Sequence, residues 1–395
     1  MMSQGNSMAT FKIGDTPRRV EDARFLTGAG CYVDDMQLEN MVHAVVLRSP
    51  HSHADVKSID VSSAKVASGV LAVLTGADLD AAGIGPLQPY EQVNVYSDEP
   101  FSFPTQYPLA KERVRYAGEP VALIIAESHA VGLDAAELID VDYAPLPALI
   151  DIEAAVNSGE REKICLKWSV GDRQAANVAF KAAAHVTRLD IRNHRIVTNS
   201  MEPRGAIGEF DPVSGRYTLH VSAQSLHMAR DRVAETLGID TSKVRLIAPD
   251  VGGGFGVKNF IYAEQVLLSW AARVAGRPVK WINARSDGFV SDHQARDNDA
   301  HAELALDADG NFTALRINSW GNLGAYLTGS MARIFTEQFV KLPGGPYRIP
   351  AIHVDVGAVY TNTVPIGVTR GPGYAEFANI MERLVDRAAR ETGQK

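Results

Sequence analysis

Cysteine is scarce in this sequence, which has only Cys31 and Cys165 among its 395 residues. Two thiols cannot supply the four ligands of a cysteine-bound iron–sulfur cluster or zinc site, and they do not suggest a disulfide framework. Both thiols are therefore expected to be reduced, which is typical of a cytoplasmic protein.

Long apolar runs are missing as well. The longest stretches, such as Val121 to Ala126, are far shorter than the roughly 20 residues that cross a bilayer. Arg18 and Arg19 resemble the start of a twin-arginine export signal, but charged residues follow where an apolar segment should begin. The net charge is −8 and the basic residues are scattered, which argues against nucleic acid or an anionic membrane as a partner.

The composition is that of a globular protein, with 46% hydrophobic residues and 33 glycines. A chain of this length is expected to form two or three domains. Residues 1–10 are polar and irregular and are predicted to be a disordered leader. Residues 11–150 and 167–395 are predicted to be two domains, joined by a linker at 151–166.

Short elements are expected in the first of these domains. Apolar runs at 42–47 and 121–125 have the length of strands. The segment 130–139 has helical periodicity and leads into a strand at 140–143. The first domain is therefore predicted to belong to the α+β class.

The second domain is also predicted to be α+β. Turn sequences at 211–215 and 307–310 lie between alternating runs and predict two β-hairpins. Helical periodicity covers 226–237 and 262–274, and Gly276 is expected to end the second of these helices.

A final helix is predicted to run to about Arg390, with one apolar face. That helix either folds back on its own domain or lacks a segment that should follow it. The residues of its apolar face are Phe377, Ile380, Met381, Leu384, Val385 and Ala388.

A glycine-rich loop runs from Asp250 to Lys258, after a predicted strand at 244–247 and before a helix. Four glycines in five positions let backbone N–H groups approach a ligand, and the following helix N-terminus would favour an anion. The loop is not a dinucleotide fingerprint, because no G-x-G-x-x-G register fits it. It is not a Walker loop either, because Val257 stands where a glycine must precede Lys258. A tight structural turn and an anion site both remain open.

Two further segments carry candidate residues. Ser225 can cap the helix that follows it, and the side-chain amide of Gln224 offers a donor and an acceptor at the same place. His227 has no second histidine at helical spacing, so it is interpreted as an ordinary histidine rather than a metal ligand. Arg370 to Gly373 predicts a tight turn whose arginine suits a phosphate or an oxo group, although an exposed loop arginine is the ordinary alternative.

Taken together, these segments resemble the molybdopterin-binding large subunits of the xanthine dehydrogenase, aldehyde oxidase and aerobic carbon monoxide dehydrogenase family. The later matching segments are Met201 to Gly205, Gln224 to His227, Asp250 to Lys258 and Arg370 to Glu376. Earlier segments resemble the family's α/β hammerhead domain, and they are Gly14 to Asp22, Arg48 to Ala54, Arg115 to Val121 and Asp140 to Pro147. The resemblance implies an α+β fold: a hammerhead domain followed by the first molybdopterin-binding domain, with the second such domain absent.

The resemblance also implies a site. Gln224 would hydrogen-bond an oxo group of a molybdenum centre, Phe255 would lie beside the metal, and Arg370 would face it, so these three are the predicted catalytic residues. The predicted cofactor-binding residues are Gln224, Gly253, Gly254, Phe255, Gly256, Arg370 and Gly371. The cofactor would be molybdopterin, with or without a cytosine nucleotide, and its dithiolene would hold the metal, so no protein ligand to the metal is expected.

The implied activity is hydroxylation of an aldehyde or an N-heterocycle with oxygen from water. Electrons would leave through an iron–sulfur small subunit to FAD on a medium subunit. The family's catalytic glutamate lies beyond the region that this chain reaches, and neither Glu202 nor Glu376 corresponds to it. The chain is therefore not expected to turn over substrate alone, and the other half of the large subunit is expected on another chain. A catalytically inactive truncated remnant or a subunit-interaction module is the alternative.

Three replacements narrow the substrate. Gly371 follows Arg370 where copper-containing carbon monoxide dehydrogenases have a cysteine, which argues against carbon monoxide. Asn259 and Pro372 stand where purine oxidisers carry a glutamate and a phenylalanine, which argues against purines. A glycine-loop nucleotide-binding protein, which would retain ATP or NAD and no molybdenum, is disfavoured because both nucleotide fingerprints fail.

Overall fold

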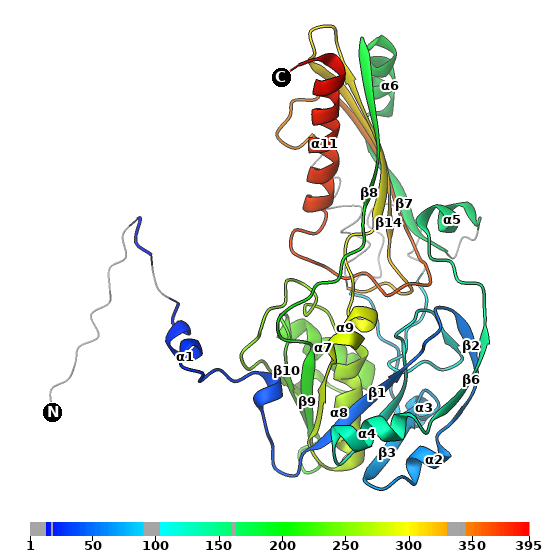
Figure 1. The fold of residues 1–395 in the computed structure, drawn as a ribbon, viewed down its shortest axis with the longest axis vertical. Helices are drawn as coiled ribbons and strands as arrows, with labels where there is room; N and C mark the ends of the chain where they lie inside the picture. The colour runs from blue at the N-terminus through cyan, green and yellow to red at the C-terminus, as the bar shows by residue number, and fades with distance from the viewer. Residues whose placement is uncertain are drawn as a thin grey trace, which may run out of the picture.

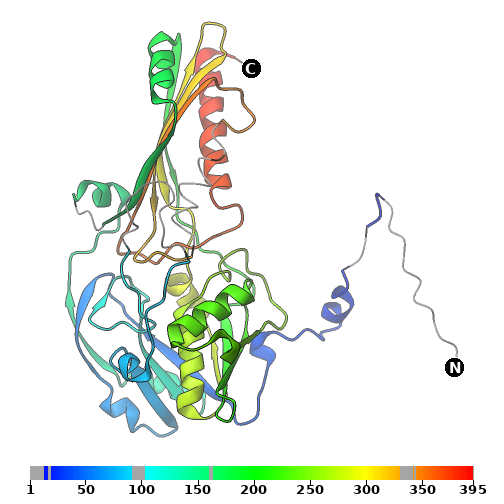
Figure 2. The same ribbon diagram turned by 180° about the vertical axis from the view of Figure 1, so that it is seen from behind.

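The computed structural model describes residues 13–16, 19–90, 103–159, 163–329, 341 and 344–394. The predicted leader at 1–10 lies outside these residues. Figure 1 shows two halves, one below the other, each built around its own main sheet. Turning the molecule by 180° shows the same division, with α1 (Asp22–Leu26) to one side of the lower half (Figure 2).

The lower half contains a seven-stranded mixed sheet with the order β11-β10-β9-β12-β1-β5-β3. Its strands are β1 (Val42–Arg48), β3 (Val70–Thr75), β5 (Pro120–Ala126), β9 (Gly205–Asp211), β10 (Arg216–Val221), β11 (Val244–Ile247) and β12 (Val279–Ile282). β1 pairs in parallel with β12, with Val42 opposite Val279, and β10 pairs in parallel with β11. Strands from both sides of the predicted linker therefore lie in one sheet, and the division into domains at 151–166 stays a prediction.

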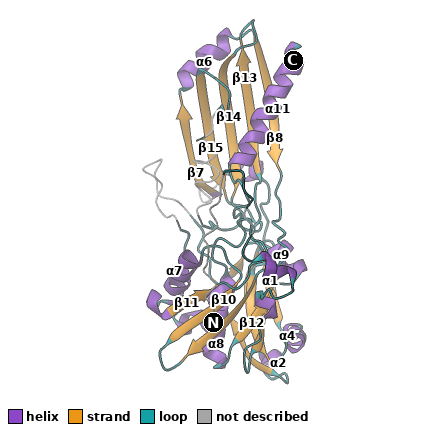
Figure 3. Ribbon diagram, turned by 90° about the vertical axis from the view of Figure 1, so that its left-hand side faces the viewer, coloured by secondary structure: helices purple, strands orange, loops and turns teal. Residues whose placement is uncertain are grey.

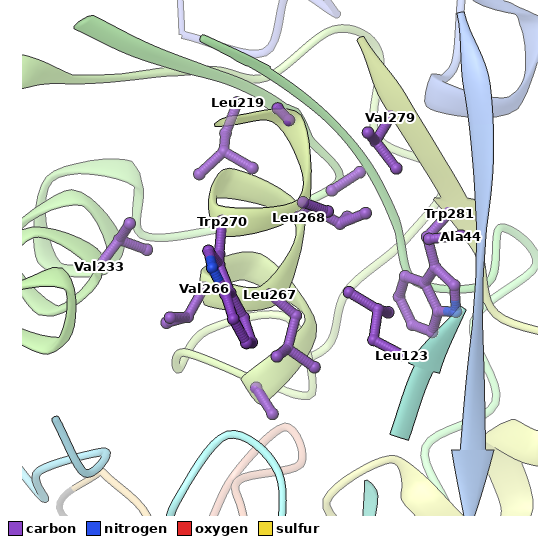
Figure 4. Close-up of a cluster of buried hydrophobic side chains, with 14 of the residues drawn as sticks. Ala44, Leu123, Leu219, Val233, Val266, Leu267, Leu268, Trp270, Val279 and Trp281 are labelled. Carbon is purple, nitrogen blue, oxygen red and sulfur yellow. The ribbon is translucent and has the colours of Figure 1, made fainter. Parts of the chain in front are cut away.

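The core of the lower half lies on α8 (Ala263–Ala275), which packs against the sheet beside α7 (Leu226–Leu237). Figure 4 shows Val266, Leu267 and Trp270 of α8 among side chains from both helices and several strands. Ten consecutive residues of α8, from Ala263 to Ala272, are buried. A helix buried on every side needs a covering layer all round, which β9, α7 and neighbouring strands supply.

A smaller antiparallel sheet with the order β4-β2-β6 completes the lower half. Its strands are β2 (Ala54–Asp60), β4 (Arg113–Val114) and β6 (Asp140–Pro145), and the helices of this region are α2 (Ser62–Lys65), α3 (Asp78–Ala82), α4 (His129–Ala136) and α9 (Arg285–Ser291). Ser128 caps α4 by accepting a hydrogen bond from Val131 N. The structure contains the predicted strands at 42–47, 121–125 and 140–143 and the helix at 130–139, and their observed ends differ from the predicted ones by no more than three residues.

The upper half is a five-stranded sheet with the order β7-β15-β14-β13-β8 (Figure 3). The strands are β7 (Ile164–Gly171), β8 (His185–Asn193), β13 (Asn298–Leu306), β14 (Phe312–Asn322) and β15 (Ala351–Val359). α11 (Tyr374–Thr392) packs on β8 and β13, while α6 (Arg173–Ala182) packs on β14 and β15 from the opposite face (Figures 1 and 2). Both predicted hairpins, β9–β10 and β13–β14, are confirmed.

The last helix folds back on its own half. Phe377, Ile380 and Leu384 of α11 are buried against the five-stranded sheet. The alternative that this helix lacks a segment to pack against is therefore wrong. An apolar face with helical periodicity predicts that the helix is buried on one side, but it does not identify the packing partner.

The predicted linker at 151–166 is not irregular throughout. It contains α5 (Ile152–Asn157), and Asp151 caps this helix by accepting hydrogen bonds from Glu153 N and Ala154 N. The linker range also includes the first residues of β7. Its polar composition hid these elements because only two α5 residues, Ile152 and Ala155, are buried. Among the described residues, no helix is long and apolar enough to span a membrane.

Glu119 joins the two halves. Tyr326, which follows β14, donates to Glu119 Oε1 at 2.5 Å, and Arg115 N donates to Oε2 at 2.6 Å. Burial outweighs these hydrogen bonds and raises the pKa of Glu119 to about 7. The folded protein therefore holds a proton on this carboxyl in a pH range where the unfolded chain has lost it.

The raised pKa of Glu119 predicts how stability depends on pH. Between an ordinary carboxyl pKa of 4.5 and about 7, the free energy of unfolding should fall as the pH rises, by roughly 3 kcal/mol in total, and should level off above that range. The variant Glu119→Gln cannot titrate and should lack this decrease. Urea unfolding of both proteins at pH 5 and pH 8 measures the difference, and equal pH slopes in the two proteins would contradict the assignment.

Candidate functional site

Two parallel strands bring the first site residues together. β10 and β11 are parallel neighbours, so the segments that follow them leave from the same edge of the sheet. Gln224 follows β10, and the glycine loop follows β11. Gln224 N donates to Lys258 O at 2.9 Å, which fixes the two segments side by side.

The side chain of Gln224 lies against the glycine loop. Gly256 N donates to Gln224 Oε1 at 2.8 Å, so the carbonyl oxygen of the side chain is occupied within the protein. The amide Nε2 group has no hydrogen-bond partner among the described residues, and Gln224 is exposed. Gln224 therefore offers two N–H donors to a ligand above the loop.

Close packing accounts for three of the four glycines. A Cβ atom on Gly252 would lie 2.4 Å from Glu202 Cβ, and one on Gly254 would lie 2.5 Å from Gln224 Oε1. Gly256 has φ +108°, and its Cβ would lie 2.4 Å from Val368 O. These contacts explain a tight turn. The N–H groups of residues 253–255 have no acceptor in the described part of the chain. They are therefore available to an anion, and the anion site stays a prediction.

Lys258 supports the loop from below. Its Nζ is buried and donates to Glu202 Oε2 at 2.9 Å and to Ser222 Oγ at 2.7 Å. Gly252 N donates to the same Glu202 oxygen at 2.7 Å. Ser222 Oγ also donates to Glu202 Oε2, at 2.6 Å, so three donors hold the Glu202 carboxylate in place.

Arg370 lies next to Phe255. Arg370 N donates to Phe255 O at 2.8 Å, while the Arg370 side chain is exposed and forms no ion pair with any described residue. Phe255 is 51% exposed and has φ +52°, an unusual conformation for an aromatic residue. The structure therefore brings Gln224, Phe255 and Arg370 to one exposed surface. Gly371 follows with φ +76° and nothing within 4 Å of its missing Cβ.

Among the described residues, two cavities lie away from this surface. One of about 530 Å³ lies between α5 and the face of β13 and β14 that carries His301 and Trp320. Another of about 540 Å³ adjoins Glu119 and Tyr326. Phe255 is half exposed, so the surface around it is accessible.

A buried cluster of charged residues lies next to the glycine loop, and it was not identified from the sequence. Its members are Arg48, Arg204, Glu264 and Asp292. Arg204 donates to Glu264 Oε2 at 3.0 Å and to Asp292 Oδ1 at 2.7 Å, and Arg48 donates to Glu264 Oε1 at 2.7 Å. The Arg204 guanidinium lies 3.7 Å from the centre of the Tyr262 ring. Tyr262 OH donates to Val257 O at 2.7 Å, which connects the cluster to the glycine loop.

The charges of this cluster set its pKa values. Burial alone would raise the pKa of Glu264, but Arg204 and Arg48 outweigh it and hold that pKa well below its ordinary value. Burial and the nearby Arg204 lower the pKa of His293, which stacks on Tyr262, to about 3. His293 is therefore neutral, and the cluster carries its charge on arginine and carboxylate groups only.

Arg296 is a second residue that sequence reasoning missed. Its guanidinium donates to the carbonyl oxygens of the segment around Arg370 and to Glu376 Oε1 at 3.1 Å. Glu376 is 3% exposed, so it is engaged in an ion pair rather than free to take a proton from a substrate. No sequence signal marks Arg296, because its partners lie more than 70 residues away.

Two local expectations are corrected. Ser225 is the N-cap residue of α7, but its hydroxyl donates to Asn259 Oδ1 instead of accepting from the helix. α8 begins at Ala263, so residues 259–262 separate it from the glycine loop, and Glu264 already places a negative charge in its first turn. The helix therefore does not follow the glycine loop directly, contrary to the expectation from the sequence. His227 is exposed, and the described residues contain no group of three His, Cys, Asp or Glu side chains that could hold a metal.

Two family models match this chain. Residues 156–395 match the molybdopterin cofactor-binding domain, and residues 27–147 match the a/b hammerhead domain of aldehyde oxidase and xanthine dehydrogenase. The first match covers more than half of the chain. The chain therefore belongs to the molybdopterin-binding family of aldehyde oxidases and xanthine dehydrogenases, as the resemblance in the sequence indicated, and the predicted fold class is confirmed.

Several relatives are similar over nearly the whole chain. The carbon monoxide dehydrogenase large chain of Afipia carboxidovorans is 32% identical over 95% of this chain and 48% of its own. The 6-hydroxypseudooxynicotine dehydrogenase complex subunit gamma of Paenarthrobacter nicotinovorans is 34% identical over 99% of this chain and 49% of its own. The crystal structure of quinoline 2-oxidoreductase from Pseudomonas putida 86 is 34% identical, with a TM-score of 0.89 over 97% of this chain and 49% of that one.

The chain thus spans about half the length of these relatives. The nicotinate dehydrogenase large molybdopterin subunit of Eubacterium barkeri differs in this respect. It is 26% identical over 96% of this chain, and the match covers 86% of its own length. A molybdopterin subunit of about this extent therefore exists in the family.

Proposed function

We propose that this chain forms one wall of the molybdenum site of a hydroxylase that oxidises an aldehyde or an N-heterocycle. The observation that carries the proposal is the convergence, on one exposed surface, of donors that have no partner among the residues that the structure describes. These donors are the N–H groups of residues 253–255, the Nε2 group of Gln224 and the guanidinium of Arg370. They fit a cofactor that brings its own metal and offers oxygen and sulfur acceptors, because such a group needs hydrogen-bond donors rather than metal ligands.

When bound, molybdopterin supplies a metal centre that accepts two electrons from the substrate, with the new oxygen coming from water. Gln224 would donate a hydrogen bond from Nε2, and its orientation is fixed because Oε1 accepts from Gly256 N. Phe255 would present its ring at the surface where a flat substrate lies, and Arg370 would hold a fixed positive charge beside it. Gly253, Gly254 and Gly256 would let the backbone approach the cofactor, while Gly371 would leave the space after Arg370 open.

The site needs a further protein segment to enclose it, in addition to the two halves of this structure. Glu202 and Glu376 are both bound by cations of this chain, so neither is free to act as the base. We assign the base, and the exclusion of water, to the part of the large subunit that the longer relatives have in addition. The subunit of similar extent in Eubacterium barkeri supports a version of the enzyme in which that part is a separate chain. Relatives named as a large chain and as a complex subunit support further partners, for which we propose an iron–sulfur subunit and an FAD subunit.

The substrate proposal favours an N-heterocycle or an aldehyde over carbon monoxide or a purine. Gly371 offers no thiol after Arg370, and Asn259 is occupied by the Ser225 hydroxyl. Relatives whose names mention quinoline and a nicotine derivative support a heterocycle. The 32% identity to a carbon monoxide dehydrogenase large chain makes carbon monoxide the substrate to test beside them.

Elemental analysis tests the proposal. We expect stoichiometric molybdenum in the complex obtained by co-expressing this chain with the polypeptides encoded beside it, and little in the isolated chain, because one open wall gives few contacts. Stoichiometric molybdenum in the isolated chain would show that the second half is unnecessary for binding. A folded complex without molybdenum would favour the inactive remnant, and copurified ATP or NAD would favour a nucleotide-binding protein.

A further inference from the structure

Arg296 holds the backbone on both sides of Arg370. It lies just before β13, and residues 369–371 lie just before α11. Arg296 Nη2 donates to Arg370 O at 2.9 Å, and Nη1 lies 3.2 Å from Thr369 O and 3.4 Å from Gly371 O. One guanidinium therefore contacts three consecutive carbonyl oxygens.

The other side of the same guanidinium is anchored by a carboxylate. Nη1 lies 3.1 Å from Glu376 Oε1, and the side chains of Arg296 and Glu376 are 14% and 3% exposed. Glu376 belongs to the first turn of α11, so the ion pair connects the loop to a helix that is itself buried on the five-stranded sheet. A planar guanidinium with five N–H groups can make all of these contacts at once, whereas a lysine cannot.

The backbone at Arg296 adopts an uncommon conformation to reach this position. Arg296 and Asp297 have φ values of +66° and +67°, which non-glycine residues seldom adopt. The Asp297 carboxylate accepts from Arg195 Nε and Asn322 Nδ2, both at 2.9 Å, and Asn322 N donates to Asp297 O. Strained pairs of this kind persist where the surroundings fix them, and they gather at functional sites.

These contacts fix the backbone of Arg370 but not its side chain. Its N–H donates to Phe255 O and its carbonyl accepts from Arg296, so both backbone groups are fixed while the guanidinium stays exposed. We propose that Arg296 is a positioning residue that sets the place of the Arg370 guanidinium relative to Gln224 and Phe255. This inference rests on the proposed function for its catalytic meaning, whereas the hold of Arg296 on the loop does not.

Hydrogen exchange on the isolated chain tests that hold. In Arg296→Met, the amides of residues 368–371 and 373 should exchange about tenfold faster, because the three carbonyl contacts are lost. Arg296→Lys should show a smaller increase, and Glu376→Gln should show an increase without removing the guanidinium. The control is Arg192→Met on β8, which removes a bidentate pair with Asp299 on β13 and should leave these amides unchanged. Equal protection in Arg296→Met and the wild type would overturn the proposal.

A kinetic measurement on the completed enzyme then tests the positioning role. At equal molybdenum content, kcat of Arg296→Met should fall about 100-fold, as expected for a misplaced active-site group, and Arg296→Lys should recover part of it. A purely structural role would instead lower the melting temperature with kcat per molybdenum unchanged, which would overturn the proposal. A wild-type complex without molybdenum would contradict the proposed function alone, because the exchange measurement needs no cofactor.

Discussion

The variant Gly256→Ala is expected to abolish molybdenum retention in the completed enzyme. At φ +108° an alanine is strained, and its Cβ would lie 2.4 Å from Val368 O and 2.8 Å from Val368 Cγ2. The loop would have to move away from the segment that leads to Arg370. That movement would break the hydrogen bond from Gly256 N that orients Gln224, so the donors would no longer converge.

A matched glycine variant separates strain from collision. Gly215 in the β9–β10 turn has φ +67° with nothing within 4 Å of its missing Cβ, so Gly215→Ala should cost about 1 kcal/mol of stability and leave molybdenum content unchanged. Molybdenum per protein, measured by elemental analysis of both purified complexes, decides the matter. Wild-type molybdenum content in Gly256→Ala would show that the glycine loop does not hold the cofactor.

The variant Glu264→Gln should produce the largest loss of stability. Glu264 lies between Arg204 and Arg48, whose side chains are 6% and 8% exposed. Removing its charge leaves these arginines with less compensation in a buried setting, and a loss of about 3–5 kcal/mol is expected in the free energy of unfolding. Urea denaturation at pH 7 measures it.

Glu303 provides the control for this prediction. It also lies between two arginines, Arg188 and Arg316, but their side chains are 61% and 32% exposed. Glu303→Gln should therefore cost no more than about 1 kcal/mol. Since the pKa of Glu264 is depressed, its contribution should be complete above the ordinary carboxyl pKa and should disappear as the pH falls through its lowered value. A Glu264→Gln variant as stable as Glu303→Gln would show that the cluster is not electrostatically coupled.

Local patterns predicted much of this fold. The turn at 211–215 requires an αL glycine and alternating flanks, and both lie within a few residues, so the β9–β10 hairpin could be identified. The helix ending at Gly276 was predictable for the same reason. The proximity of Gln224 to the glycine loop followed only from the family resemblance, since parallel pairing of β10 with β11 leaves no local mark.

The supporting ion pairs of the candidate site could not be predicted, because their partners are far apart in the sequence. Arg48 and Glu264 are 216 positions apart, and Arg296 and Glu376 are 80 apart. A charged residue in a list of amino acids is ordinarily expected at the surface, so nothing indicated that these would be buried. The supporting residues of the candidate site were therefore found only in three dimensions.

The pairing of β1 with β12 predicts how a truncated fragment of this protein would behave. Val42 and His43 of β1 pair with β12, which pairs with β9 on its other side. A fragment starting near residue 167 would lack β1, so β12 would become an unpaired edge strand. Unpaired N–H and C=O groups along such an edge recruit other chains. Expression of the region from about residue 167 to residue 395 without the preceding residues would thus favour aggregation over folding.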